Sequence, residues 1–403
     1  MLIWSLAFRN LFRHRGRLIL NLILLVGGIS TIVCFKGFKT HILTTIQELV
    51  VDAQTGHIQI AKKKFWENAP VEQVTDRMME NPTQLMSQIS LIEGVQFVSP
   101  RLEFYGLVNK DDQSVSAHFI GLQPDVEVRA QKSVFFIEGK PFLNSKETIL
   151  STGLKSQLSA KPTDEVTIVA QTLAGGINAM DLSVSGIFSS GFSEIDNGTI
   201  FLPLKDTQKI LDTSYVDRLV VRVSDDDRLF KIKGQIADLI KNSDLEVKDW
   251  KQLAELYVQV ENFYIFQNIV IEFIIISLLF LSVANTVSMT VFERLSEIGT
   301  LRALGDYEGD IQKLFLVESF ILGMIAITLS VPVSTILVQI VKALNFSIVL
   351  PLASQPLPVL VVPTWDGYLE ASLSCLFSVV VASLLPARKG ARVSIVSALG
   401  AKI

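Results

Sequence analysis

The sequence predicts an integral membrane protein with four transmembrane α-helices and a large mixed α/β domain inserted between helices 1 and 2. The 403 residues are 49% hydrophobic and only 19% charged, with a mean hydropathy of +0.42, which is too apolar for an ordinary soluble protein of this length. Four apolar runs are long enough to span a bilayer. Between the first two runs lies a long stretch whose shorter patterns are typical of alternating strands and helices.

The chain begins with a basic amphipathic segment, residues 1–17, which predicts a cytoplasmic helix at the membrane interface. Its apolar face carries Trp4, Ala7, Phe8 and Leu11. The first span follows at 18–38, and we expect Lys36 to snorkel from its end to the interface. A cleaved signal peptide is the alternative. The apolar run is too long for a typical signal peptide, however, and no small-x-small cleavage site follows it.

Residues 39–262 predict the α/β domain, as one domain or two closely packed subdomains. Strand patterns occur at Gly56–Ile60, Val95–Val108, Ser116–Leu122, Glu165–Ala170, Asp181–Phe188, Thr199–Leu202 and Arg218–Val223. Helical patterns occur at Pro82–Ile89, Lys205–Leu211, Asp227–Asn242 and Trp250–Asn268. The last of these leads directly into the second span, so we expect the two to form one continuous stalk.

The remaining spans and connections follow from the apolar runs. They are 263–292 (second span with its stalk), 293–313 (loop), 314–341 (third span), 342–367 (loop), 368–387 (fourth span) and 388–403 (tail). Glu272, Glu318 and Glu370 lie near helix ends. An acid inside a membrane is a candidate functional residue, but near the interface we expect it to be solvated. Pro332 is expected to kink the third helix.

The distribution of basic residues predicts the topology. Four arginines precede the first span, three basic residues lie in 293–313 and four in 388–403, whereas 342–367 contains only Lys342. The positive-inside rule therefore places both termini and the 293–313 loop in the cytoplasm, and the large domain outside.

The sequence offers little for catalysis. It contains no Gly-x-x-x-x-Gly-Lys-Ser/Thr loop, no His-Glu-x-x-His motif, no Cys or His cluster and no nucleophile elbow. Cys34 and Cys375 fall in apolar runs, and the net charge of −4 does not indicate nucleic acid. We predict no catalytic, cofactor-binding or metal-binding residue in this chain, and no enzyme activity of its own.

The most informative stretch runs from Glu293 to Gly305, between two spans. Its leucines and isoleucine recur at helical spacing and predict one apolar stripe, with the charged residues pointing elsewhere. The stripe consists of Leu295, Ile298, Leu301 and Leu304. Gly305 stands where a helix C-cap is expected. From physics alone, an ordinary amphipathic helix in a surface loop is the favoured interpretation.

The pattern Glu-Arg-x-x-Glu-Ile-Gly-x-x-Arg-Ala-x-Gly at 293–305 resembles the cytoplasmic loop of the FtsX/MacB/LolE superfamily of ABC transporter permeases. The resemblance implies that this helix docks on a separate ATPase, which would bind ATP and Mg in place of this chain. It assigns the coupling role to Glu293, Arg294, Glu297, Ile298, Gly299, Arg302 and Gly305. Leu384–Val393 followed by Ser397–Leu399 is similar to the superfamily's C-terminal ending, with Gly390 in place of a usual alanine and Ile395 where proline is frequent.

Within the large domain, several motifs are similar to the lipoprotein-releasing LolC/LolE branch. They are Thr55–Gln59, Val184–Phe188, Ile200–Leu204 and Gln208–Leu211, together with Thr148–Leu154 and Asp164–Val166, where Thr163 replaces a glycine. The resemblance implies a multi-pass protein of the bacterial inner membrane that releases lipoproteins or similar amphiphiles by mechanotransmission. The implied partners are LolD-like ATPase subunits, a second permease chain in a homodimer or LolC/LolE-like heterodimer, the lipoprotein and a periplasmic carrier.

Two other functions are compatible with this plan. An FtsX-like chain would regulate periplasmic cell-wall hydrolases, and a MacB-like chain would serve efflux or export. FtsX-type chains generally have a much smaller outward domain, and MacB-type chains usually carry a fused N-terminal ATPase. Both comparisons favour lipoprotein release.

Overall fold

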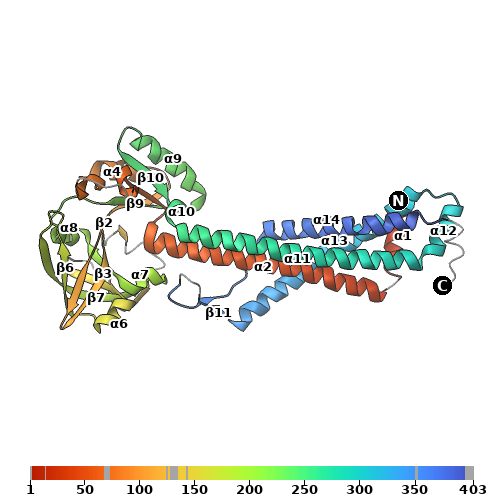
Figure 1. The fold of residues 1–403 in the computed structure, drawn as a ribbon, viewed down its shortest axis with the longest axis horizontal. Coiled ribbons are helices and arrows are strands. Elements are labelled where there is room, and N and C mark those ends of the chain that lie inside the picture. The colour runs from red at the N-terminus through yellow and green to blue at the C-terminus, as the bar shows by residue number, and fades with distance from the viewer. Residues whose placement is uncertain are drawn as a thin grey trace. The chain divides into compact units, whose positions relative to one another are not determined.

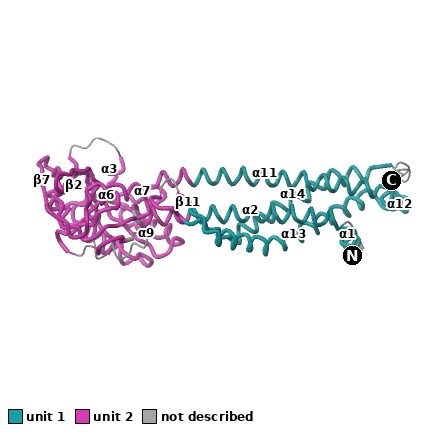
Figure 2. Tube along the Cα trace, turned by 90° about the horizontal axis from the view of Figure 1, so that it is seen from below, with its two compact units in different colours: residues 1–43, 261–347, 358–403 teal, residues 44–260, 348–357 magenta. Residues whose placement is uncertain are grey.

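The computed structural model describes residues 2–13, 15–67, 73–123, 126–127, 135–141, 144–349 and 353–394. The chain divides into two compact units (Figure 2). Unit 1 comprises residues 1–43, 261–347 and 358–403, and unit 2 comprises residues 44–260 and 348–357.

Unit 1 is helical (Figure 1). Among the described residues, four helices are long and apolar enough to cross a membrane: α2 (Arg15–Val50), α11 (Glu255–Glu293), α13 (Glu308–Leu344) and α14 (Trp365–Ala391). Two short helices accompany them, α1 (Leu2–Leu11) and α12 (Leu295–Ala303). The N-terminal helix is shorter than the predicted 1–17, because Arg15 and Arg17 already belong to α2.

The four long helices share one apolar core. It is built from Leu25, Ile29 and Ile32 of α2, Leu279 and Val283 of α11, Leu322 and Ala326 of α13, and Ala371, Cys375 and Val379 of α14. Small residues allow close approach between helices in a membrane, where packing rather than the hydrophobic effect drives association. Gly28 is one example, because a Cβ at this position would lie 2.8 Å from Cδ1 of Leu279.

A second apolar cluster joins the helix ends beside α12. It contains Val291, Ile298, Ile311, Phe315, Ala387 and Ala391. Gly390 lies against it, and a Cβ there would be 2.3 Å from Cγ1 of Val291. The replacement of the superfamily's usual alanine by Gly390 therefore has a steric reason in this chain.

Unit 2 contains a ten-stranded sheet in its described residues, with the order β10-β1-β9-β2-β3-β8-β5-β7-β4 and β6 paired to β2 and β7. The strands are β1 (Ile58–Lys62), β2 (Val95–Lys110), β3 (Gln113–Leu122), β4 (Phe135–Gly139), β5 (Glu147–Ser151), β6 (Glu165–Gln171), β7 (Ile177–Ser189), β8 (Thr199–Pro203), β9 (Arg218–Val223) and β10 (Leu245–Asp249). The long strand β2 joins the part of the sheet that contains β9 to the part that contains β3, because it pairs with β9 up to Arg101 and with β3 from Leu102 onward. All seven predicted strands are confirmed, and β4, β5 and β10 were missed.

Short helices accompany the sheet of unit 2, and several of them contribute buried residues to its apolar core. They include α3 (Lys63–Trp66), α4 (Thr83–Ser90), α6 (Thr152–Leu158), α7 (Ser193–Gly198), α8 (Leu204–Leu211), α9 (Leu229–Ile240) and α10 (Trp250–Leu253). The predicted helices at α4, α8 and α9 are confirmed. The single helix predicted for Trp250–Asn268 is wrong in one respect, because Ala254 leaves the helical region and separates α10 from α11. Asp249 and Gln252 form a capping box around α10 that explains the separate short helix.

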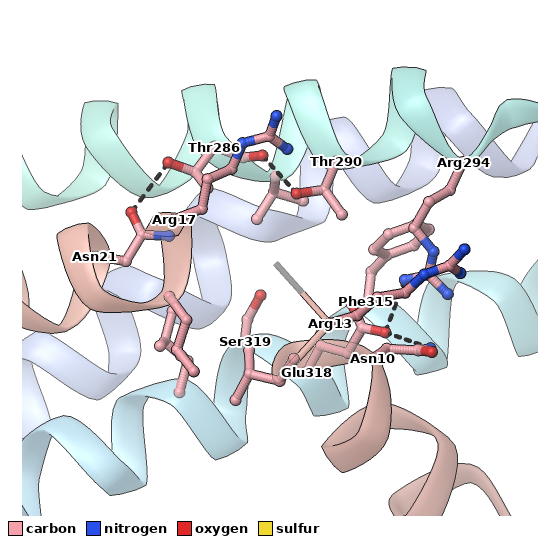
Figure 3. Close-up of a pocket in the computed structure, with 14 residues that line it drawn as sticks. Asn10, Arg13, Arg17, Asn21, Thr286, Thr290, Arg294, Phe315, Glu318 and Ser319 are labelled. Atoms are coloured by element: carbon pink, nitrogen blue, oxygen red, sulfur yellow. Dashed lines mark hydrogen bonds and ion pairs between the residues drawn. The ribbon is translucent and has the colours of Figure 1, made fainter. Parts of the chain in front are cut away.

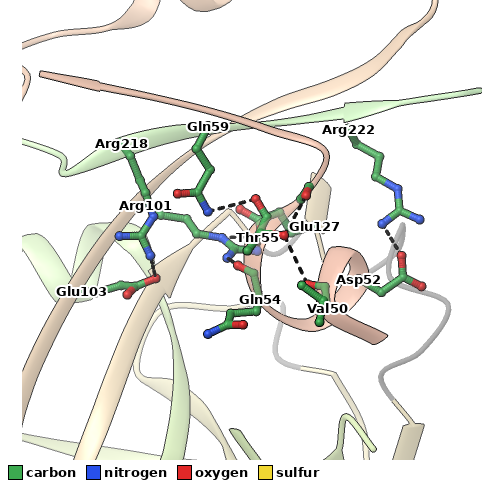
Figure 4. Close-up of polar contacts among 11 residues, drawn as sticks. Val50, Asp52, Gln54, Thr55, Gln59, Arg101, Glu103, Glu127, Arg218 and Arg222 are labelled. Atoms are coloured by element: carbon green, nitrogen blue, oxygen red, sulfur yellow. Dashed lines mark hydrogen bonds and ion pairs between the residues drawn. The ribbon is translucent and has the colours of Figure 1, made fainter. Parts of the chain in front are cut away.

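Buried ion pairs connect the segment after α2 to the sheet (Figure 4). Nη2 of Arg101 lies 2.7 Å from Oε2 of Glu127, and its Nη1 donates to the carbonyl of Gln54 at 2.5 Å. Arg222 pairs with Asp52. Because buried charges are tolerated only when paired and hydrogen-bonded, these contacts fix how the chain leaves α2 and enters β1.

The Gly390 contact yields a stability prediction. We expect Gly390→Ala to lower the free energy of unfolding of the purified chain in detergent by about 1–3 kcal/mol, the usual effect of overpacking. The reason is that the side chain of Val291 has little rotational freedom to move away. Adding Val291→Ala to Gly390→Ala should recover most of the loss. Equal melting temperatures for the wild type and Gly390→Ala would contradict the steric explanation.

Candidate functional site

The segment singled out by the sequence forms helix α12 between α11 and α13. Gly305 has φ +111°, its N–H donates to the carbonyl of Arg302, and the N–H of Asp306 donates to the carbonyl of Leu301. These two bonds are a Schellman motif, which satisfies the last carbonyls of a helix and requires the left-handed conformation that glycine adopts easily. The predicted C-terminal role of Gly305 is confirmed.

The apolar side of α12 is narrower than predicted. Ile298 and Gly299 are buried, and Leu301 packs against the cluster around Val291 and Phe315. Leu304, however, is 81% exposed, so the predicted apolar stripe is not packed along its whole length. The helix ends at Ala303, and Leu304 therefore projects beyond the packed part of the segment.

The charged side of α12 is bonded into the helix bundle. Nη1 of Arg294 lies 2.9 Å from Oε1 of Glu318 in α13, and its Nε lies 3.1 Å from Oε2 of Glu297. The Arg294 guanidinium also lies over the ring of Phe315, 5.6 Å from the ring centroid. Glu318 is only 8% exposed, so the expectation that it is merely solvated is wrong. Arg294 thereby connects α12 to α13.

The N-terminal segment supplies the remaining partners of this site (Figure 3). Asn10 donates to Oε1 of Glu318 at 2.9 Å, Arg13 lies 2.6 Å from Oε1 of Glu297, and Arg17 binds both oxygens of Glu293. Sequence analysis placed these residues at the membrane interface and missed their partners. A usable signal was present, since the basic residues before the first span complement the acids just after the second.

Glu297 stands between two arginines. Burial by itself raises the pKa of Glu297, but hydrogen bonds from Arg13 and Arg294 outweigh this effect and lower the pKa from its ordinary value. A carboxyl with a lowered pKa stabilises the folded state above its ordinary pKa, and this contribution is lost as the pH falls through the lowered value. The link from Arg13 to α12 is therefore fully formed at neutral pH.

A small cavity of about 70 Å³, lined by both polar and apolar side chains, lies among these groups. Besides the residues already named, it is lined by Asn21, Thr286, Thr290 and Ser319 (Figure 3). Thr286 donates to Oδ1 of Asn21 at 3.0 Å. The cavity is large enough for water and offers several polar partners, which is the environment in which buried water is stable.

Arg302 contacts the C-terminal part of the chain. Its Nη1 donates to the carbonyl of Val393 at 2.6 Å, and its Nη2 lies 3.3 Å from Oε1 of Glu308. The structure thus brings six of the predicted coupling residues into internal contacts, and Gly305 terminates the helix. Ile395, Ser397–Leu399 and Lys402 of the tail lie outside the described residues.

A second buried ion cluster connects three spanning helices. Nζ of Lys36 in α2 lies 3.2 Å from Oε2 of Glu272 in α11 and 2.7 Å from Oε2 of Glu370 in α14. Lys36 is only 5% exposed, so the predicted snorkelling is wrong. The prediction of a solvated acid is also wrong for Glu272, whereas the side chain of Glu370 is 66% exposed.

Within the described residues, no group of three or more His, Cys, Asp and Glu side chains could hold a metal ion. The features that distinguish the site are buried charge pairs, a capped helix and close packing, all of which make it rigid.

Residues 269–395 match the family described as FtsX-like permease C-terminal. The matched region begins within α11 and includes α12, α13 and α14, and it therefore contains residues 293–305. These comparisons support the FtsX/MacB/LolE superfamily of ABC transporter permeases for this chain. The superfamily predicted from the 293–305 motif is confirmed.

Similarity to individual permeases extends over most of the chain. The chain is 23% identical over 393 residues to the lipoprotein-releasing system transmembrane protein LolC of Xylella fastidiosa (strain 9a5c), covering 92% of this chain and 89% of that protein. It is 26% identical over 226 residues to an uncharacterised ABC transporter permease of Methanocaldococcus jannaschii, covering 54% of each. The periplasmic region of MacB from Actinobacillus actinomycetemcomitans matches at 13% identity and a TM-score of 0.36, covering 50% of this chain and 92% of that chain.

The buried pair of Arg294 and Glu318 can be tested by stability. We expect Glu318→Ala to destabilise the purified permease by about 3–5 kcal/mol, the usual effect of removing one partner of a buried ion pair. Asp310→Ala, which removes an exposed pair with Lys313 on the same helix, should cost less than about 1 kcal/mol. Thermal unfolding in detergent measures both, and similar shifts for the two variants would contradict the assigned burial.

The Lys36 cluster gives a second stability prediction. Lys36→Met leaves two carboxylates together without a cation, and we expect a loss of about 3 kcal/mol or more. Removing one acid as well, in Lys36→Met with Glu272→Gln, should recover part of this loss. A double-mutant cycle on thermal stability measures the coupling, and strictly additive effects would show that the two side chains do not interact.

Proposed function

We propose that this chain is the permease subunit of an ABC complex in the bacterial inner membrane. A separate LolD-like ATPase would hydrolyse ATP, and the permease would use the resulting movement to release lipoproteins or similar amphiphiles from the outer leaflet. The observation that carries this proposal is the similarity to LolC over 92% of the chain. The proposed complex contains two permease chains, either two copies of this chain or this chain with a LolE-like partner, and delivers its substrate to a periplasmic carrier.

In this proposal α12 lies in the cytoplasm and receives the movement of the ATPase. The positive-inside rule supports a cytoplasmic location for α12, since basic residues cluster at 1–17, 293–313 and 388–403. The large α/β domain, between α2 and α11 in the chain, would then face the periplasm. The turn between α12 and α13 also presents exposed apolar groups suited to a protein contact, because Leu304 and Tyr307 are 81% and 80% exposed.

The internal contacts of α12 support a transmitting role. Arg294 ties the start of α12 to α13, and the pair of Glu297 with Arg13 ties α12 to the N-terminal segment. The pair of Glu293 with Arg17 ties the end of α11 to α2. Since α12 also follows α11 directly, a push on it would act on several helices together. The residues predicted for coupling thus act as transmitters, while Leu304 and Tyr307 form the docking surface.

These two roles predict different phenotypes. We expect Glu297→Ala and Arg302→Ala to keep the ATPase bound and the fold intact but to uncouple ATP hydrolysis from release. Leu304→Asp should instead reduce the amount of ATPase that copurifies, because a charge on an apolar contact surface disfavours docking. Asp310→Ala serves as a control in the same region. Wild-type coupling in both Glu297→Ala and Arg302→Ala would remove the transmitting role.

The substrate is tested by mass spectrometry of the complex purified from native membranes together with its ATPase. We expect triacylated lipoproteins to be retained without ATP and released when ATP is added. A complex that carries no acylated protein and retains a cell-wall hydrolase would identify an FtsX-like regulator. Retention of an efflux adaptor would identify a MacB-like transporter.

A further inference from the structure

Unit 2 contains a buried carboxylate that binds two segments distant in sequence. Asp196 in α7 is 2% exposed and lies beside the loop that follows β7. Its Oδ1 accepts from the N–H of Ser190 at 2.6 Å and from the hydroxyl of Ser190 at 2.9 Å. Its Oδ2 accepts from the hydroxyl of Ser189 at 2.7 Å and from the N–H of Gly191 at 3.2 Å.

The second segment comes from the connection between α13 and α14. Ser354 also donates its hydroxyl to Oδ2 of Asp196, and its N–H donates to the carbonyl of Gly191 at 3.0 Å. Phe192 and Ala353 form an antiparallel bridge, and Gln355 donates to the hydroxyl of Ser189 at 3.2 Å. Residues 348–357 consequently belong to unit 2, although both helices that they connect belong to unit 1.

The same loop also meets the end of α2. Gly191 has φ +75°, and a Cβ at this position would lie 3.1 Å from Cδ2 of Leu49. The loop at 189–192 therefore contacts the last turn of α2 on one side and the α13–α14 connection on the other. A glycine is favoured here because both the backbone conformation and the close approach of Leu49 disfavour a side chain.

We infer that Asp196 is a positioning residue that clamps the α13–α14 connection onto the α/β unit, so that movement of these two helices reaches the unit through this clamp. If the clamp were lost, only α2 and α11 would connect the two units through the covalent chain. The inference rests on the proposed function in one respect, since it assumes that ATP hydrolysis moves the helices. It does not depend on the identity of the substrate.

The charge of Asp196 is what makes the clamp specific. A carboxylate accepts hydrogen bonds on both oxygens, and bonds to an ionised acceptor are stronger than those between neutral groups. Asparagine has nearly the same shape but places an NH₂ group where one oxygen now accepts bonds from donors. Asp196→Asn therefore removes acceptors with little change in volume, and Ser354→Ala removes only the hydroxyl contributed by the connection.

The experiment is hydrogen–deuterium exchange on the full permease in complex with its ATPase, with and without ATP. In the absence of ATP, we expect Asp196→Asn and Ser354→Ala to accelerate exchange at 353–357 by about tenfold or more, as expected for loss of a hydrogen bond to a charged acceptor. On addition of ATP, exchange in unit 2 should change in the wild type and change much less in both variants. Asp206→Asn is the matched control, because Asp206 is equally buried in unit 2 and binds Ser145, Lys146 and Lys209 instead of the clamp.

A cross-link supplies the converse measurement. Phe192 and Ala353 occupy opposed positions of an antiparallel bridge, which brings their Cα atoms within disulfide range, so Phe192→Cys with Ala353→Cys can form a disulfide. Added to Ser354→Ala, this disulfide should restore the ATP-dependent change in unit 2, and reductant should abolish it again.

Three results would overturn the clamp. These are a wild-type response to ATP in both single variants, an equal loss of response in Asp206→Asn, and a wild-type complex whose unit 2 does not respond to ATP. Failure of the proposed substrate looks different, because the complex would then show the ATP-dependent exchange but release no acylated protein.

Discussion

A charge buried among apolar helices must be paired, and this constraint organises unit 1. An isolated ion loses so much hydration on burial that it either neutralises or finds an opposite charge. Arg294 finds Glu318 and Glu297, and Lys36 finds Glu272 and Glu370. The pairs of Arg294 with Glu318 and of Lys36 with its two acids join different helices, so they restrict the arrangement of the bundle. Apolar packing alone would allow helices to rotate or slide with less penalty.

Much of the fold could be predicted because it depends on local patterns. Apolar runs located the four long helices, and alternation located seven strands of unit 2. Three strands and one helix break were not predicted, because they depend on contacts between distant residues. The strands β4, β5 and β10 are short, and Ala254 interrupts a sequence pattern that is helical on both sides. Periodicity also assigned Leu304 to the apolar stripe of α12, because periodicity cannot show that the helix ends at Ala303 and leaves Leu304 exposed.

For the candidate site, the motif identified the correct segment but not the partners of its charges. A motif gives the spacing of Glu293, Arg294 and Glu297 along the chain, whereas Asn10, Arg13 and Glu318 approach them only in the folded bundle. The same limitation affected Lys36, whose position near the end of an apolar run favoured snorkelling. Gly390 is the opposite case. Sequence comparison marked it as a departure, and the nearby side chain of Val291 supplies the reason.

In the proposed function, pairing also explains how one short helix would both bind the ATPase and transmit its movement. A helix that only bound another protein could move independently of the membrane helices, and work done on it would be lost in local flexing. In α12, Ile298 is packed, Arg294 is anchored to α13, and the exposed groups are concentrated toward its C-terminal end. A force applied at the exposed end must therefore be carried through ion pairs that are costly to break. The clamp at Asp196 follows the same logic in unit 2, where a buried carboxylate holds the connection from α13 to α14. Both arrangements use desolvated charge as a stiff link, because breaking it exposes an unpaired ion to an apolar surrounding.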